Sequence, residues 1–170
     1  MRNSIRLALL IVPTMAAAAA FADELPPHKS GEWEVAIVGG HHAPAKMKMC
    51  VDKATEDLFY KTGLDVGAQV CDHREIKVKD NVATVEAHCK VAGSLVTTTS
   101  VARFDGDAAF HADSTTRFEP ALMGHKEAAT TQDGKWIGAC PAGMKPGDFV
   151  LDNGIKVNSK MLGALKKFLQ

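Results

Sequence analysis

The sequence predicts a mainly β protein, an antiparallel meander curled into an open barrel or sandwich. Short segments between Glu32 and Phe118 alternate apolar and polar residues, which is typical of half-buried strands. Turn sequences such as Asp80-Asn81 and Asp105-Gly106-Asp107 separate them. The strand–helix–strand pattern of a parallel sheet does not occur. Together these observations favour strands that pair with their neighbours in sequence.

The first two predicted strands lie on either side of a loop over residues 39–44. Glu32–Val38 alternates, and so does Lys46–Val51. Asp52 is a suitable N-cap for a short helix after the second strand, over Lys53–Lys61, and Gly63 is a suitable C-cap. The inward-facing side chains of the two strands are predicted to be Trp33, Val35, Ile37, Met47, Met49 and Val51.

A hairpin is predicted next, with Asp80-Asn81 as its two-residue turn. This register places Ile76 opposite Val85 and Val78 opposite Ala83. Three further strands follow. The sequence also predicts a turn at Asp133-Gly134 and a short extended piece after it. The further strands are predicted over Leu95–Phe104, Ala108–Phe118 and His125–Thr131.

The chain changes character after Cys140. A proline- and glycine-rich loop leads to a small hairpin over Phe149–Val157, and Ser159 then caps an amphipathic C-terminal helix. We expect this helix to dock on the domain, because so short a helix needs packing to be stable. Binding a partner and lying on a membrane are the alternatives. The apolar stripe of the helix consists of Met161, Leu165 and Phe168.

Residues 1–22 have the three parts of a secretory signal peptide. Arg2 and Arg6 precede an apolar run, and Ala20-Phe21-Ala22 is a cleavage site. We therefore expect cleavage after Ala22, a periplasmic location, a polar lead-in over 23–30, a β-rich domain over 31–140 and an extension over 141–170. The mature chain has 18 basic and 20 acidic residues, so its charge of −2 gives no case for binding nucleic acid. No segment after the leader is apolar enough to span a membrane.

Four cysteines behind an export leader predict two disulfide bonds. Cys50 and Cys71 share parity with polar neighbours, whereas Cys89 shares parity with Val85 and Cys140 with Trp136. This parity favours Cys50–Cys71 and Cys89–Cys140. A Cys71–Cys89 bond would require a β-bulge, because a slip of one residue reverses the face of a side chain. A redox-active pair and a zinc site are weaker interpretations, since the spacings are long.

Several of these motifs together resemble an exported bacterial family, the domain-of-unknown-function family 3617. They occur in order from Ser30 to Cys140: Gly31-Glu32-Trp33-Glu34, Met49-Cys50-Val51, the cysteines at 71 and 89, Phe104-Asp105-Gly106-Asp107 and Trp136-Ile137-Gly138-Ala139-Cys140. Glu32 departs from the apolar residue expected there. The resemblance implies a periplasmic β-rich domain and carries over no catalytic residue.

The sequence contains no recognisable catalytic motif, so we expect no enzymatic activity, no cofactor and no metal. The function it favours is binding of a small apolar ligand or of an envelope partner. One alternative is a copper site made by His41, His42, Met47 and Met49, whose ligand types suit copper. Another is an enzyme with an unrecognised site. The remaining histidines are predicted to be scattered on the surface, among them His73, His88, His111 and His125.

Overall fold

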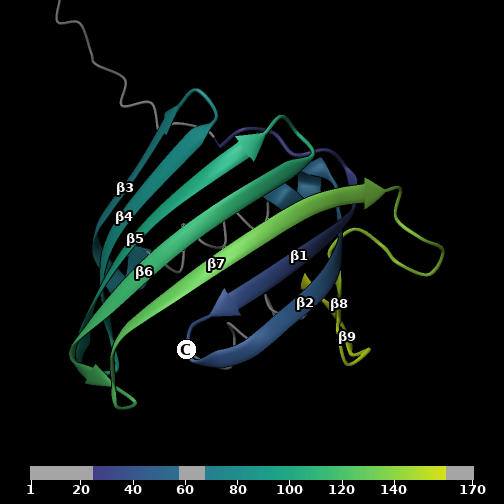
Figure 1. Ribbon diagram of the computed structural model, residues 1–170. Coiled ribbons are helices and arrows are strands. Elements are labelled where there is room, and N and C mark those ends of the chain that lie inside the picture. Colours follow the sequence, from purple (N-terminus) through teal and green to yellow (C-terminus); the bar gives the residue numbers. More distant parts are fainter. Residues whose placement is uncertain (1–24, 58–67, 160–170) are drawn as a thin grey trace, which may run out of the picture.

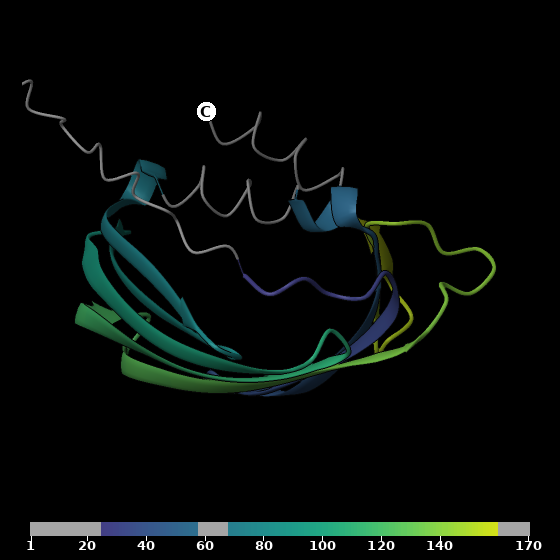
Figure 2. The same ribbon diagram turned by 90° about the horizontal axis from the view of Figure 1, so that it is seen from above.

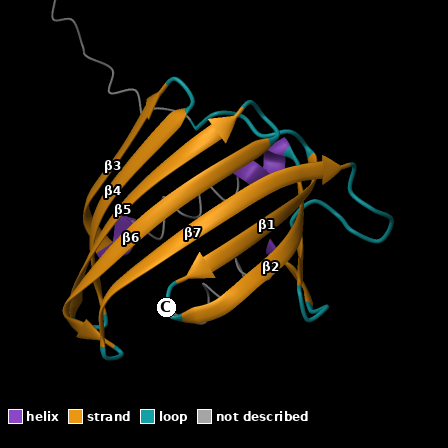
Figure 3. Ribbon diagram, viewed as in Figure 1, coloured by secondary structure: helices purple, strands orange, loops and turns teal. Residues whose placement is uncertain are grey.

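Nine antiparallel strands form one sheet in the computed structural model, which describes residues 25–57 and 68–159 (Figure 1). The described part has only two short helical stretches, residues 53–57 and 68–70 (Figure 3). The strands are β1 (Gly31–Gly39), β2 (His42–Val51), β3 (Cys71–Lys79), β4 (Val82–Val91), β5 (Ser94–Asp105), β6 (Ala109–Leu122), β7 (His125–Gly138), β8 (Asp148–Leu151) and β9 (Lys156–Asn158).

The sheet is strongly curved and does not close. Its strand order is β3-β4-β5-β6-β7-β1-β2-β8-β9, with β3 and β9 at the edges. Seen from above it forms a trough, and residues 25–30 run along the inside (Figure 2). The expectation of a mainly β, open antiparallel sheet is confirmed. The meander holds only from β3 to β7, because β1 pairs with β7 and β2 with β8, while β2 and β3 are not neighbours. The sandwich alternative is wrong, because all nine strands belong to a single sheet.

The register of the predicted hairpin is confirmed from His73 to Lys79. Ile76 lies opposite Val85 and Val78 opposite Ala83. The hairpin over Phe149–Val157 is also present, as β8 and β9. Asp52 caps the short helix after β2, since its Oδ1 accepts the backbone N–H of Thr55 at 2.8 Å. This helix is described over residues 53–57; the rest of its predicted length, the leader and the C-terminal helix lie outside the described residues.

The turn predicted at Asp133-Gly134 is wrong, because β7 runs through both residues without interruption. Gly134 lies opposite Phe110 on β6 and Val35 on β1. A Cβ atom at Gly134 would lie 2.0 Å from the Phe110 ring, so the glycine makes room for an aromatic side chain. Here packing across the sheet outweighs the local tendency of Asp-Gly to form a turn.

The predicted disulfide pairing is wrong as well: the structure contains Cys71–Cys89 and Cys50–Cys140. The bulge that Cys71–Cys89 requires is present. Cys71 lies opposite Cys89 and His73 opposite His88, so Asp72 is the extra residue. The bulge brings Cys71 to the face of Cys89. Parity arguments cannot detect it, because they assume uninterrupted alternation.

Cys50 does lie on the face that parity predicts, opposite Glu32, yet it is only 1% exposed. The chain leaving β7 passes closely over β1, where a Cβ at Gly31 would lie 2.2 Å from the carbonyl oxygen of Gly138. Gly138 has φ 149°, outside regular strand geometry. The alternation counted from Trp136 therefore fails before Cys140, which reaches Cys50 with a Cα–Cα distance of 5.6 Å.

Candidate functional site

An apolar cavity of about 430 Å³ lies between the lead-in segment and the face of β1 and β2 that carries Trp33 and Met49. This volume falls within the range of about 300 to 1,000 Å³ typical of small-molecule sites. We call it the binding cavity. Its described lining consists of Leu25, His28, Trp33, Val35, Ile37, Met47, Met49, Val51, Glu56, Phe110, Gln132 and Phe149.

Strand alternation builds the wall of this cavity. Val35 faces Met47 and Trp33 faces Met49 across β1 and β2, so their side chains point to the same side of the sheet. Trp33 and Val35 are buried, at 2% and 6% exposure. These are the inward-facing residues predicted from sequence, and methionines adapt well to ligands of irregular shape.

The segment ahead of β1 brings a polar group to the cavity. His28 Nδ1 lies 2.5 Å from Glu56 Oε1, and its ring makes edge contacts with Trp33, Phe104 and Phe110. Two tryptophans hold this segment in place. Trp33 Nε1 donates to the Lys29 carbonyl at 2.8 Å and Trp136 Nε1 to the Ser30 carbonyl at 3.1 Å.

Sequence reasoning missed His28 and Glu56 as candidate site residues. His28 precedes the first strand, where no alternation indicates a direction, and Glu56 comes from a helical turn 28 residues later. The sequence offered one signal, the residue type, since His28 is the one histidine of the lead-in over 23–30 and an imidazole can take a carboxylate partner.

The copper alternative is not supported by the positions of its four residues. Met47 and Met49 line the binding cavity. His41 and His42 lie at the exposed turn between β1 and β2, where the His41 ring stacks on His125 at 3.9 Å. Four residues of extended strand lie between His42 and Met47, which places their Cα atoms about 17 Å apart. The structure therefore does not bring the histidines and methionines together as one ligand set.

The other histidines lie on the surface as predicted, but they are not scattered. His73 and His88 form a cross-strand pair with ring centroids 5.0 Å apart. His111 lies between two carboxylates, with Nδ1 2.7 Å from Asp133 and Nε2 3.2 Å from Asp113. The hydrogen bond with Asp133 is the main cause that raises the pKa of His111.

The ion pair between Asp148 and Lys156 anchors the β8–β9 hairpin beside the cavity wall. Asp148 accepts hydrogen bonds from Asn158, Lys156 and the backbone N–H of Lys145, which together hold the pKa of its carboxyl far below its usual range. The Gly147 N–H donates to the Cys50 carbonyl at 2.8 Å. The hairpin is thereby fixed against β2, and Phe149 contributes to the cavity.

Residues 28–140 match the family described as "Protein of unknown function (DUF3617)". The chain belongs to this family. The match covers β1 to β7 and all four cysteines. Among curated proteins and solved structures no match to the chain was found.

The two disulfides of this DUF3617 member indicate an oxidising, extracytoplasmic compartment. Within residues 25–57 and 68–159, no helix is long and apolar enough to cross a membrane. The family is described as one of unknown function, so a function is inferred from the residues that line the cavity.

Proposed function

We propose that this protein is a periplasmic binding protein that holds a small, mainly apolar ligand in the binding cavity without transforming it. The observation that carries the proposal is the cavity itself. Its volume is about 430 Å³, its wall is mainly apolar, and the His28–Glu56 pair is among its lining groups. Ligand sites commonly combine apolar walls with a few polar groups that set the orientation of the ligand.

The lining favours an amphipathic ligand that binds in one orientation. Its apolar body would lie against Val35, Met47 and Met49, where burial stabilises binding by about 25 cal/mol per Å² of apolar surface. Its polar end would meet the imidazole of His28, which can donate or accept a hydrogen bond, while the Glu56 carboxylate accepts from His28 Nδ1. A fatty acid or a similar single-chain amphiphile has this chemistry.

Ligand binding can be tested with a fluorescent fatty acid such as dansyl-undecanoic acid. Met47→Trp fills the cavity, so we expect it to weaken probe binding at least tenfold. Lys46→Trp is the matched control, because the same side chain then lies on the opposite face of β2. Equal affinity of the probe for both variants and the wild type would contradict the proposal.

Analysis of the ligand after incubation distinguishes the binding function from the alternative of an enzyme. A His–Glu pair can also activate a water molecule, so the relevant measurement is whether the ligand is released unchanged. Mass spectrometry of the ligand after prolonged incubation is expected to show no new product. A product that forms with wild type and not with His28→Gln would contradict the binding proposal and show that the protein is an enzyme. The intact mass of the protein in the same spectra tests cleavage after Ala22.

A further inference from the structure

Four metal-ligand side chains meet on the convex face of the β3–β4 hairpin. His73 lies directly opposite His88, and Glu75 directly opposite Glu86. Each strand therefore carries one histidine and one glutamate two residues apart, and the pattern His-x-Glu on β3 faces Glu-x-His on β4. Alternate residues on a strand share a face, so all four side chains point to the same side of the sheet. We call these four residues the hairpin cluster.

The distances among three members of the hairpin cluster suit a single ion, and His88 adjoins them through Glu86. The ligand atoms of His73, Glu75 and Glu86 all lie within 4.8 Å of one another. His88 Nε2 lies 3.3 Å from Glu86 Oε1. Ligand atoms around a zinc ion are about 3.4 to 4.2 Å apart, because each is about 2.1 Å from the metal. Small rotations of these exposed side chains close the difference.

The disulfide and the bulge place these residues on one face. Cys89 and His88 are adjacent in sequence and so point to opposite faces of β4. On β3 the bulge at Asp72 lets Cys71 pair with Cys89 on one face while His73 pairs with His88 on the other. The extra residue Asp72 therefore allows both the disulfide and the cross-strand histidine pair to form. The backbone beneath the hairpin cluster is covalently fixed.

The charges of the hairpin cluster also favour a cation. Like charges directly opposite each other on neighbouring strands are destabilising, and Glu75 and Glu86 are such a pair. Lys77 offsets part of this repulsion, because its Nζ lies 2.9 Å from Glu75 Oε2. A divalent cation bound between the two carboxylates would offset it further and would compete with Lys77.

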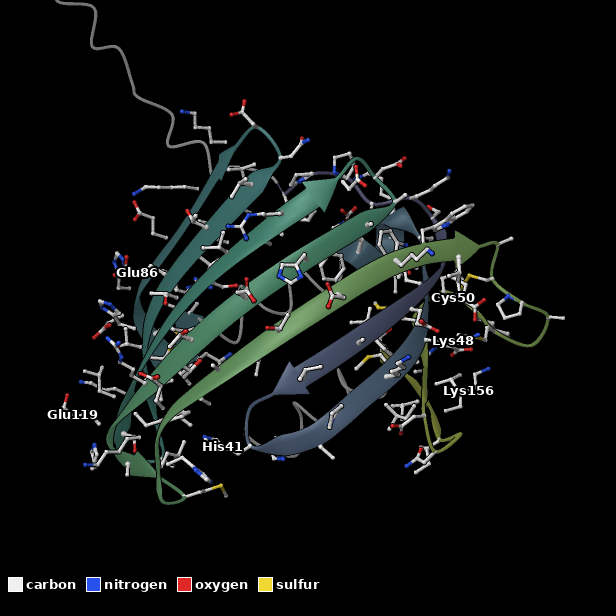
Figure 4. The ribbon with its side chains drawn as sticks, in the orientation of Figure 1. His41, Lys48, Cys50, Glu86, Glu119 and Lys156 are labelled. Carbon is white, nitrogen blue, oxygen red and sulfur yellow. A yellow bond between two sulfur atoms is a disulfide. The ribbon has the colours of Figure 1, made fainter. Side chains whose placement is uncertain are left out.

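We propose that His73, Glu75, Glu86 and His88 bind a divalent transition-metal ion, Zn²⁺ or Cu²⁺. Two imidazoles and two carboxylates are the donors that these ions take from proteins, and the affinity order places Cu²⁺ above Zn²⁺. The site is open to solvent on the convex face, since Glu75, Glu86 and His88 side chains are 45%, 50% and 39% exposed. Figure 4 shows Glu86 beside the β3–β4 hairpin, far from Lys48 and Cys50 at the opposite end of the sheet. The ion is therefore exchangeable, and its site is separate from the binding cavity.

Calorimetric titration of the oxidised, tag-free protein with Zn²⁺ tests the proposal. We expect one ion per chain, and affinity at least tenfold weaker for His73→Ala/His88→Ala. The matched control is His41→Ala/His125→Ala, which removes a second pair of exposed, adjacent histidines and should leave the affinity unchanged. Lys77→Ala should strengthen binding by up to about fivefold, the worth of one exposed ion pair.

Spectroscopy gives a readout of the ligands themselves. In the Cu²⁺ complex, electron paramagnetic resonance is expected to show coupling to two imidazole nitrogens, and the coupling should be lost in His73→Ala/His88→Ala. Far-ultraviolet circular dichroism of each variant checks that the sheet is intact. Loss of binding in the His41/His125 variant, or Zn²⁺ binding that is the same in all variants, would overturn the assignment.

Discussion

The two ends of the sheet are stabilised in different ways. At the β1–β2 end, buried side chains and a long-range disulfide hold the strands together. At the β3–β4 end, the strands are held by hairpin pairing and a local disulfide. Four of the five buried apolar residues within the described ranges belong to β1 and β2, and only Ala83 belongs to the hairpin. The disulfides join cysteines 90 and 18 residues apart, respectively.

Each end has the candidate site that its construction allows. Burial on the concave face leaves an apolar cavity lined by side chains from β1 and β2. The hairpin end has little apolar burial, so its convex face can carry four exposed polar ligands in register. A cavity needs packing from several strands, whereas a metal cluster needs only two strands whose register is fixed.

The largest expected effect is loss of the long-range disulfide. Cys50→Ala/Cys140→Ala opens a loop closed across 90 residues, for which chain entropy predicts a loss of about 4.6 kcal/mol in the free energy of unfolding. Urea unfolding of the variant measures it. Because the bond fastens the chain after β7 over β1, probe binding in the cavity should weaken while Zn²⁺ binding persists. A stability loss smaller than that of the hairpin disulfide would contradict this difference between the ends.

Loss of the hairpin disulfide should have the second largest effect. Cys71→Ala/Cys89→Ala opens a loop closed across 18 residues, which predicts a loss of about 3.2 kcal/mol. The bulge at Asp72 is then no longer fixed, so Zn²⁺ affinity should fall while probe binding in the cavity is retained. Titration and urea unfolding of the same sample measure both quantities. If this variant lost the cavity and kept the metal, the assignment of the two sites to the two ends would be wrong.

A smaller effect is expected at the glycine beneath the aromatic ring. Gly134→Ala places a methyl group 2.0 Å from the present position of the Phe110 ring, which must shift. Overpacking of this kind costs about 1 to 3 kcal/mol. Thermal unfolding measures the loss, and Gly106→Ala, at a turn where a Cβ would meet no neighbour but φ is 57°, separates ring displacement from backbone strain. Phe110→Leu should restore part of the stability to Gly134→Ala but not to Gly106→Ala.

Alternation predicted most of this fold, because a strand with one buried face has to repeat every two residues. It gave the inward residues of β1 and β2 and the Ile76–Val85 register. It failed wherever the repeat is interrupted: the bulge at Asp72 and the departure from strand geometry at Gly138 reversed the predicted disulfides.

The sites depend on contacts that sequence distance hides. His28 meets Glu56 only because the trough brings the lead-in segment beside a helical turn. The hairpin cluster was within reach, because the predicted register already places His73 opposite His88 and Glu75 opposite Glu86. What the register could not show is the bulge at Asp72, which changes the partner of Cys71 and has no pattern of its own in one sequence.

The smallest expected effect concerns His111, which lies on β6 between the two ends. Its pKa is raised, mainly by the hydrogen bond with Asp133, so its contribution to stability is fully present below about pH 6.5 and is lost as pH rises through the raised value. Wild type should therefore lose urea resistance relative to His111→Gln as pH rises above about 6.5. Added salt should shrink this difference, since the ion pairs with Asp113 and Asp133 are exposed. His125→Gln, away from these carboxylates, should keep the wild-type pH profile; if it instead flattened the profile as His111→Gln is expected to, the pH dependence would belong to another group.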